Sequence, residues 1–294
     1  MNQPKKQTFH FTKMQGLGND YIYVNCFEEH IEDPAAVSCF VSDRHFGIGG
    51  DGLVLIGPSK TADVRMRIFN ADGSEAEMCG NASRCVARYA SEHNLVQGDT
   101  VRIETGAGLR IAKLIRENGE VCGAAVDMGE PILAQGKLPL SLPAGFDPEA
   151  SYLNKPFAAA GAEWRANVVS MGNPHNVLFL DRTGLALEDL DLDEMGPSFE
   201  NHPLFPERTN TEFVRVESKD SVSMRVWERG SGETLACGTG ACAVACASYA
   251  TGRTGRSVDV HLVGGTLHIL WDEETNHVFM TGAAVPVFEG VITV

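Results

Sequence analysis

The chain has 294 residues, a formal net charge of -15 and 43% hydrophobic residues. This length is typical of two domains, and the hydrophobic content is sufficient for a core in each. The excess of carboxylates argues against a surface for nucleic acid or acidic membranes, because either would need a local excess of Lys and Arg. We therefore expect an acidic soluble protein with neither kind of partner.

The first 13 residues carry charges but no apolar segment of the secretory type, and no apolar run approaches the roughly 18 residues of a membrane helix. These features predict a cytoplasmic protein. Eight cysteines are too sparse for a disulfide framework in a chain of this length, so we expect them to be reduced. Six are interpreted as small buried hydrophobic residues: Cys26, Cys39, Cys85, Cys122, Cys242 and Cys246.

The first half of the chain alternates between short apolar segments and glycine-rich turns. Residues 7–24 predict a strand, a loop with Asn19 and Asp20 at its tip, and a second strand. Residues 33–43 predict a short helix with Pro34 in its first turn. Further strands are expected at 53–56 and 64–69, a helix at 80–92, and hairpin strands between 101 and 129.

Residues 47–52 match the G-x-G-x-x-G pattern of dinucleotide-binding loops. A dinucleotide site requires a strand before the glycines and a helix after them. Here the glycines lead into the apolar strand 53–56 instead. We interpret the segment as a glycine-rich turn and not as a cofactor site.

The second half repeats the pattern of the first. After a Pro- and Gly-rich connection at 131–155, residues 166–180 predict a strand, a loop at 171–175 and another strand. A helix and loop are expected at 188–203, a strand at 221–227, and a buried helix at 238–250 that Gly252 ends. The strands expected from 258 to 294 include one that completes the sheet of the first domain.

The repeat aligns without a gap around two Cys-Gly pairs. At an offset of about 158 positions, Cys79-Gly80 falls on Cys237-Gly238, and the strand at 64–70 falls on 222–228. At a slightly shorter offset, the segment after Asn19 resembles the segment after Asn173. Two repeats of this length indicate two similar domains that each bring one Cys-Gly to a shared site.

Each of these cysteines is expected at a helix N-terminus, which can lower a thiol pKa. Free Cys has a pKa near 8.5 and is about 3% thiolate at pH 7, so reaching half requires roughly 2 kcal/mol. A helix dipole alone hardly supplies that, and further polar partners are expected. His175, which follows Gly-Asn-Pro, and Glu228, which aligns with Asn70, are the candidates.

The residues beside the two cysteines are small, so a ligand can reach backbone N–H groups at both helix starts. Such a site suits one carboxylate. A carboxylate held there would place its own α-carbon between the two thiols. One thiolate could then remove the α-proton while the opposite thiol delivers a proton to the other face, which inverts the centre.

Cysteines in such positions can have other roles. A structural zinc site would need clustered pairs two to four residues apart, and a dithiol redox protein usually carries C-x-x-C; the sequence has neither. A thiol-disulfide switch, in which Cys79 and Cys237 pair, stays open as a hypothesis of a different class. Mild oxidant would activate such a switch and inactivate an acid–base pair.

These motifs resemble those of diaminopimelate epimerases over nearly the whole chain. The resemblance is carried by residues 14–20, 70–75 with 79–81, 171–175, 206–210, and 228–230 with 236–240. Proline racemases are similar in the two Cys-Gly segments. The Glu-Arg-Gly turn at 228–230 and the Gly-Leu-Gly-Asn-Asp start at 16–20 favour the epimerases.

The resemblance implies an α/β (α+β) fold with two pseudo-symmetric domains, each a curved, mostly antiparallel sheet or barrel around a central helix. The domains would be 1–126 with 280–294, and 127–279. The implied reaction interconverts LL- and meso-diaminopimelate without pyridoxal phosphate or metal, on the route to lysine and peptidoglycan. Relatives are dimeric, so a homodimer is expected.

The resemblance also assigns roles to residues. Cys79 and Cys237 would be the acid–base pair, supported by His175 and Glu228. Glu228 would also contact substrate. The remaining positions would bind substrate: Gly80, Asn81, Gly238 and Thr239 at the α-carboxylate, Asn70, Asn210 and Arg229 toward the distal end, and Asn19 and Asn173 along the site.

Two positions depart from the family pattern. Ala82 stands where many members have glycine, and Gly52 where some have a glutamine that contacts substrate. Neither removes a proton-transfer group. They leave open the finer substrate contacts, and a proline or hydroxyproline racemase of the same fold is the alternative.

Overall fold

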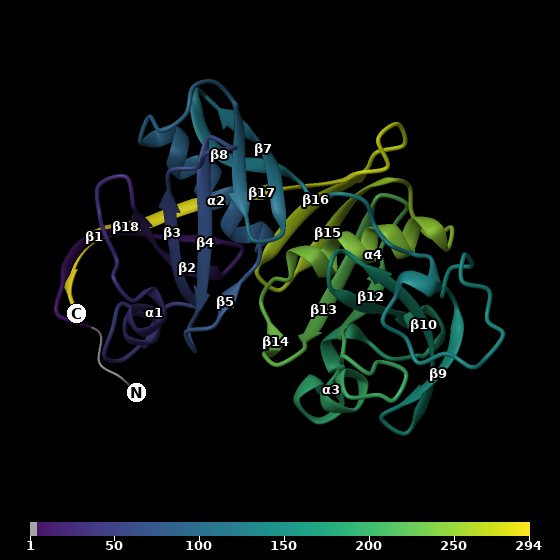
Figure 1. Ribbon diagram of the computed structural model, residues 1–294. Coiled ribbons are helices and arrows are strands. Elements are labelled where there is room, and N and C mark those ends of the chain that lie inside the picture. Colours follow the sequence, from purple (N-terminus) through teal and green to yellow (C-terminus); the bar gives the residue numbers. More distant parts are fainter. Residues whose placement is uncertain (1–4) are drawn as a thin grey trace. The chain divides into compact units, whose positions relative to one another are not determined.

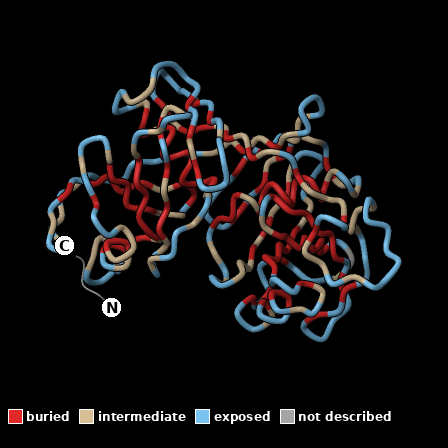
Figure 2. Tube along the Cα trace, in the orientation of Figure 1, coloured by how far each residue is buried: buried red, intermediate tan, exposed pale blue. Residues whose placement is uncertain are grey.

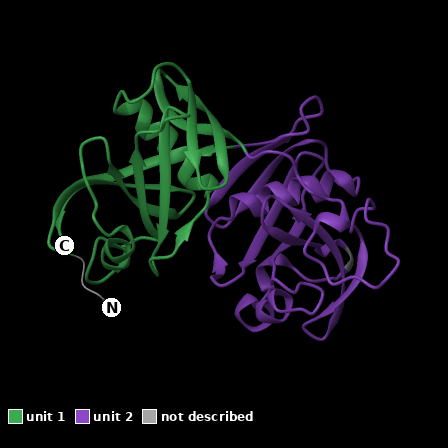
Figure 3. Cartoon of the chain, in the orientation of Figure 1, with its two compact units in different colours: residues 1–127, 281–294 green, residues 128–280 purple. Residues whose placement is uncertain are grey.

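The computed structural model describes residues 5–294, the side chain of Arg182 excepted, and its backbone divides into two compact units. Unit 1 extends to Asp127 and also contains Thr281–Val294, while unit 2 comprises Met128–Met280 (Figure 3). Each unit is a mixed sheet and helix structure dominated by strands (Figure 1). The α/β fold class is confirmed.

Unit 1 contains one mostly antiparallel set of strands and two helices. The hydrogen-bonded order is β18-β1-β2-β3-β4-β6-β7-β8; β2/β3 and β4/β6 are parallel pairs, and β5 pairs with β4. The elements are β1 (Thr8–Gly16), β2 (Asn19–Asn25), α1 (Pro34–Ser42), β3 (Gly52–Gly57), β4 (Val64–Asn70), β5 (Glu75–Ala76), α2 (Gly80–Glu92), β6 (Thr100–Thr105), β7 (Gly108–Glu117), β8 (Glu120–Asp127) and β18 (Val285–Thr293).

Unit 2 has the strand order β9-β10-β11-β12-β13-β15-β16, with parallel pairs at β11/β12 and β13/β15. Its strands are β9 (Lys155–Ala159), β10 (Ala162–Ser170), β11 (Pro174–Phe179), β12 (Asn210–Val216), β13 (Ser221–Glu228), β14 (Gly232–Thr234), β15 (Ser257–Leu262) and β16 (Gly265–Trp271). The helices are α3 (Leu192–Glu200) and α4 (Gly238–Ala250), with 3-10 turns at Gln135–Lys137, Leu180–Arg182 and Leu187–Asp189. Strand β17 (Val278–Ala283) crosses the boundary between the units.

The two units share one topology. The series β1-β2-β3-β4-β6-β7 and the series β10-β11-β12-β13-β15-β16 have the same sequence of antiparallel and parallel pairs. Each has a short hairpin strand, β5 or β14, just before the central helix. The internal repeat predicted from the sequence is therefore a repeat of structure.

A buried helix lies at the centre of each unit. Helix α2 contacts β1, β2, β4, β6, β7 and β8, and α4 contacts β10, β11, β12, β15 and β16. Helix α4 is apolar on nearly every side, which accounts for its burial (Figure 2). It ends where Gly252 adopts a φ of 73°, a conformation that glycine adopts readily.

Strand β18 pairs antiparallel with β1, so the last strand completes the sheet of unit 1 as the sequence predicts. The predicted loop positions of Asn19, Asp20 and His175 are wrong. Asn19 and Asp20 are the first two residues of β2, because the turn uses Leu17 and Gly18, both with positive φ. His175 lies inside β11, paired with Val169, and not in the preceding loop.

The eight cysteines are free thiols, and Cys85, Cys242 and Cys246 are buried as predicted. Cys26, Cys39 and Cys122 are only half-buried, so the prediction of buried residues is wrong for these three. Cys26 lies in the turn after β2, Cys39 in α1 and Cys122 in β8. Among the helices of residues 5–294, none combines the length and apolarity of a membrane span.

Candidate active site

Cys79 and Cys237 occupy equivalent positions in the two units. Each is the N-cap residue of a central helix, with extended backbone, and the following glycine starts the helix. The hairpin before each cysteine is held by an equivalent bidentate ion pair. Arg67 binds Glu75 at 2.7 and 2.9 Å, and Arg225 binds Glu233 at 2.7 and 2.8 Å.

In unit 1, Cys79 is half-buried and its Sγ donates to Oδ1 of Asn19 at 3.4 Å. The amide of Asn19 is oriented because its Nδ2 donates to Asp51 at 2.8 Å. Burial raises the pKa of Asp51, while the hydrogen bonds from Asp20 and Asn19 lower it. Asn19 therefore lies beside Cys79, and Asp51 is the residue that fixes its orientation.

In unit 2, Cys237 is buried at 5% exposure. Its sulfur accepts from the N–H of Gly240 at 3.4 Å and lies 3.6 Å from the hydroxyl of Thr239. Burial raises the pKa of the Cys237 thiol well above its ordinary value, and the carboxylates of Glu228 and Glu212 raise it further. The helix N-terminus thus does not by itself produce a thiolate here.

His175 and Glu212 form a hydrogen bond that is inaccessible to solvent. Nδ1 of His175 and Oε1 of Glu212 are 2.6 Å apart, and both side chains have 0% exposure. Nε2 of His175 lies 3.1 Å from Oδ1 of Asn173, whose Nδ2 donates to Thr239 at 3.3 Å. The predicted residues His175, Asn173 and Thr239 are thus connected in one network that reaches Cys237.

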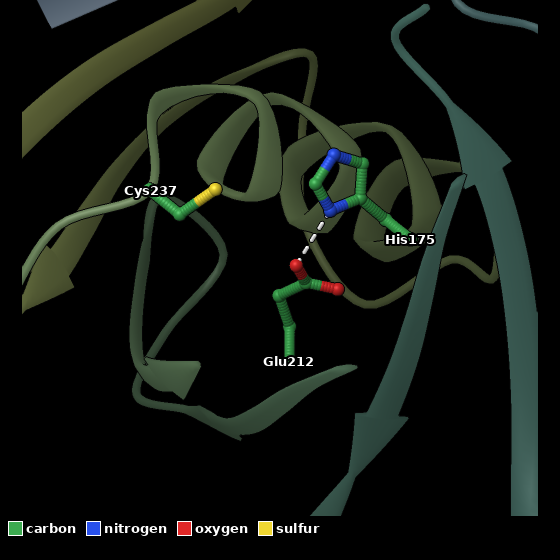
Figure 4. A group of neighbouring side chains, drawn as sticks. All are labelled: His175, Glu212 and Cys237. Atoms are coloured by element: carbon green, nitrogen blue, oxygen red, sulfur yellow. Dashed lines mark hydrogen bonds and ion pairs between the residues drawn. The ribbon is translucent and has the colours of Figure 1, made fainter. Parts of the chain in front are cut away.

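Figure 4 shows His175, Glu212 and Cys237 pointing toward one another, with one ligand-type atom of each within 4.8 Å of the other two. Two ligands of a tetrahedral zinc ion would be about 3.3 Å apart. The 2.6 Å between the ring nitrogen and the carboxylate is a hydrogen-bond distance instead. We describe the group as a hydrogen-bonded network.

Glu228 ends β13, and its carboxylate accepts a hydrogen bond from the Thr234 hydroxyl. Although the residue as a whole is half-buried, its carboxyl group faces the protein. Burial raises the pKa of Glu228, while hydrogen bonds from Thr234 and Cys237 act in the opposite direction. A carboxyl group with a raised pKa next to a thiol is suited to exchanging protons with it.

The turn that follows Glu228 is held from α3. The carboxylate of Glu200 accepts from the N–H of Gly230 at 2.9 Å and from the indole of Trp227 at 2.8 Å. Oδ1 of Asn210 accepts from the N–H of Arg229 at 2.9 Å, and Nδ2 of Asn210 donates to Pro174. Asn210 is therefore adjacent to Arg229, and in this structure its side chain positions the turn.

Arg229 lines a cavity of about 400 Å³ in unit 2, together with Lys137, Ser170, Gly172 and Glu207. This cavity has two cationic side chains on its wall. In unit 1, Asn70 ends β4 at the position equivalent to Glu228, and its Nδ2 donates to Ser74 at 2.9 Å. Gly80, Asn81 and Gly238 lie buried in the first turns of the two helices.

Glu212 is the site residue that sequence reasoning missed. Glu212 aligns with Val54 in the repeat, and it precedes the apolar residues Phe213 and Val214 of a strand. A carboxylate at a strand position where the other copy has an apolar residue was the sequence signal that could have identified it. The two family departures also have structural reasons. A Cβ at Gly52 would lie 2.1 Å from the carbonyl oxygen of Phe69. The equivalent of Ala82 in unit 2 is Gly240, where the Glu212 carboxylate leaves no room for a Cβ; no carboxylate occupies the corresponding place beside Ala82, because Val54 stands where unit 2 has Glu212.

Solved structures with the same fold are known. The chain superimposes on a phenazine biosynthesis protein of the PhzF family from Bacillus anthracis with a TM-score of 0.69 and 17% identity, covering 98% of this chain and 100% of that chain. A hydroxyproline epimerase from Agrobacterium vitis gives a TM-score of 0.67 and 15% identity, with coverages of 98% and 92%. At these identities the likeness establishes the fold.

Sequence similarity identifies the family. The family model for diaminopimelate epimerase matches residues 11–134 and 167–287. A diaminopimelate epimerase from Desulfovibrio desulfuricans is 57% identical over 95% of this chain and 96% of its own length, and one from Agathobacter rectalis is 53% identical over 97% and 99%. The chain belongs to the diaminopimelate epimerase family, as the sequence motifs predict.

Proposed function

We propose that the protein is an isomerase that interconverts LL- and meso-diaminopimelate by a two-base cysteine mechanism, on the route to lysine and peptidoglycan. The observation that carries this proposal is the pair of equivalent N-cap cysteines, each followed by glycine at the start of a buried helix. Relatives of 57% and 53% identity that are named diaminopimelate epimerase favour this substrate over proline or hydroxyproline.

In this mechanism the two units are the N-terminal and C-terminal epimerase domains, and each presents one thiol to the α-carbon. Backbone N–H groups of the first helical turns, at Gly80, Asn81, Gly238 and Thr239, bind the α-carboxylate. Holding that anion beside the α-carbon also stabilises the negative charge that develops when the proton leaves. No pyridoxal phosphate or metal is required in this scheme.

The two thiols start the reaction in different protonation states in this proposal. Burial and two carboxylates raise the pKa of Cys237, which favours a protonated thiol that acts as the acid in this state. Cys79 would then start as the base, once it has lost the proton that its thiol donates to Asn19 in this structure. Glu228 can accept the proton of Cys237 when the reaction runs in the other direction, because its own pKa is raised.

The distal end of the substrate carries a second carboxylate. Arg229 can bind it in bidentate fashion, with Lys137 on the same cavity wall. Asn70 completes the distal contacts, Asn210 positions the turn that carries Arg229, and Asn19 and Asn173 line the site. A guanidinium at this position discriminates against substrates with one carboxylate, such as proline.

The test is solvent deuterium incorporation at the α-carbon, measured by mass spectrometry for a panel of amino acids. Diaminopimelate should exchange and invert, whereas proline, hydroxyproline and lysine should not. Preferential exchange of proline would contradict the substrate assignment. Exchange that requires added pyridoxal phosphate or survives loss of both thiols would contradict the mechanism.

We further expect a cytoplasmic homodimer. Support comes from β18, which exposes Val287 at 56%, Phe288 at 48% and Val291 at 57%, an apolar strip suited to a second copy of the chain. Light scattering after size exclusion should give twice the chain mass. A monomer at micromolar concentration would contradict the expectation.

A further inference from the structure

Glu212 is a buried acidic residue for which the two-base scheme has no role. It lies in β12 with 0% exposure, and its Oε2 has no hydrogen-bond partner among residues 5–294. An ionised carboxylate in such a place is costly unless its surroundings compensate. A residue kept there at that cost is a candidate for a functional role.

The compensation comes from two directions. His175 binds Oε1 at 2.6 Å, and the start of helix α4 lies against the same oxygen, where the helix dipole favours a negative charge. The approach is close enough that a Cβ added at Gly240 would lie 2.7 Å from Oε1. Glycine at 240 therefore makes room for the carboxylate beside Cys237.

The geometry fixes which ring nitrogen of His175 carries a proton. An ionised carboxylate only accepts hydrogen bonds, so Nδ1 of His175 must donate to Glu212. Nε2 is then the nitrogen whose proton the carboxylate does not determine. Its neighbour Asn173 and the hydroxyl of Thr239 can each present a donor or an acceptor, so the network is satisfied in both states.

We propose that Glu212 is a positioning residue that holds His175 with its proton on Nδ1 and thereby leaves Nε2 for proton exchange in the acid–base site. This inference rests on the acid–base function proposed above. It follows the same logic by which a buried carboxylate orients a catalytic histidine in other enzymes. In unit 1 the equivalent residues are Tyr21 and Val54, so these positions hold a histidine–carboxylate hydrogen bond in unit 2 and not in unit 1.

The direct test is made on the wild-type protein. In two-bond 15N–1H NMR spectra of the wild-type protein, Nδ1 of His175 should be protonated at every pH at which the protein is folded and active. The signal is assigned by its loss in His175→Gln. A His175 ring with its proton on Nε2 alone would overturn the proposal.

The kinetic test is Glu212→Gln, which keeps the size of the side chain but can turn its amide N–H toward Nδ1 and invert the tautomer. We expect kcat to fall by roughly 10- to 1,000-fold while KM changes by less than about threefold. The matched control is Thr211→Val. Thr211 is equally buried on the same strand, points to the opposite face, and its hydroxyl has no partner within residues 5–294.

A double variant separates positioning from stability. If Glu212 acts through His175, then Glu212→Gln should cost little more in a His175→Gln background, whereas independent effects would multiply. Unchanged kcat in a folded Glu212→Gln enzyme, or multiplicative effects, would overturn the proposal while wild-type epimerisation stands. A wild-type protein that fails to epimerise diaminopimelate would instead contradict the proposed function, whatever the ring tautomer.

Discussion

The two central cysteines have the same backbone setting and different surroundings. Cys79 is half-buried, and its thiol donates to the neutral amide of Asn19. Cys237 is buried, caps its own helix through Gly240, and lies near Glu212, His175 and Glu228. A shared topology thus holds one thiol in a neutral polar environment and the other in a charged, desolvated one.

This difference shows that a repeat can be symmetric in geometry and asymmetric in proton affinity. Equivalent strands place equivalent Cα positions, but the side chains at those positions have diverged. Tyr21, Val54 and Asn70 in unit 1 correspond by register and offset to His175, Glu212 and Glu228 in unit 2. An enzyme that both takes and gives a proton needs such an inequality, because one group must start protonated and the other not.

The largest effect is expected from removing either thiol. Cys79→Ser and Cys237→Ser should each lower epimerisation by about 10²- to 10⁴-fold, the usual contribution of a positioned acid or base. Each variant should still exchange the α-hydrogen of one epimer faster than that of the other, since one base remains. Deuterium exchange of the separate LL and meso substrates measures this, and near wild-type inversion by either variant would refute the two-base scheme.

Glu228→Gln tests the charged surroundings of Cys237. We expect kcat to fall by roughly 10²-fold because the proton partner of the thiol is lost. Removing the negative charge should also lower the pKa of Cys237, so that its alkylation by iodoacetamide, followed by peptide mapping, starts at lower pH. Alkylation of Cys79 serves as the internal control, and an unchanged Cys237 profile would contradict the charge effect.

The same variant makes a prediction for stability. Burial raises the pKa of Glu228 above its unfolded value near 4.3, so the carboxyl group stabilises the fold fully below that pH and loses this contribution as the pH rises through the folded value. Glutamine does not titrate. As the pH rises from about 4 to 7, the wild type should therefore lose stability relative to Glu228→Gln. The difference between their free energies of unfolding, measured by urea titration, should shift in favour of the variant.

A smaller effect is expected from exchanging the third residue of each central helix. Gly240→Ala would push a methyl group against the Glu212 carboxylate and should cost about 1–3 kcal/mol in unfolding free energy and lower kcat. Ala82→Gly, at the equivalent position in unit 1, should cost only about 1 kcal/mol and leave the network of unit 2 unchanged. Equal effects of the two changes would contradict the asymmetry.

The smallest effect concerns the hairpin ion pairs. Glu75→Gln and Glu233→Gln should each cost under about 1 kcal/mol, since exposed pairs contribute little. Glu233→Gln should cost more, because the side chains of Arg225 and Glu233 are 19% and 29% exposed against 38% and 46% for Arg67 and Glu75. Urea unfolding with and without added salt measures both, and the unit 1 pair should be the more salt-sensitive.

Much of this fold follows from local patterns in the sequence. The apolar alternation of β4 and β13, the helical spacing after Cys79 and Cys237, and the positions of the turn glycines are all readable because strands and helices have fixed periods. The constant offset of the repeat gave the equivalence of the two cysteines. Local patterns were less reliable at element ends, where Asn19 and His175 were placed in loops and belong to strands.

The sequence by itself determined the internal repeat, the two N-cap cysteines and the family, because each of these depends only on residue types and their spacing along the chain. Tertiary structure decided what surrounds each thiol. The burial of Glu212 against His175, the desolvation of Cys237 and the partial exposure of Cys26, Cys39 and Cys122 depend on which strands and helices cover a side chain. Proton affinity depends on that burial and on charges from distant parts of the chain, and no local pattern records either.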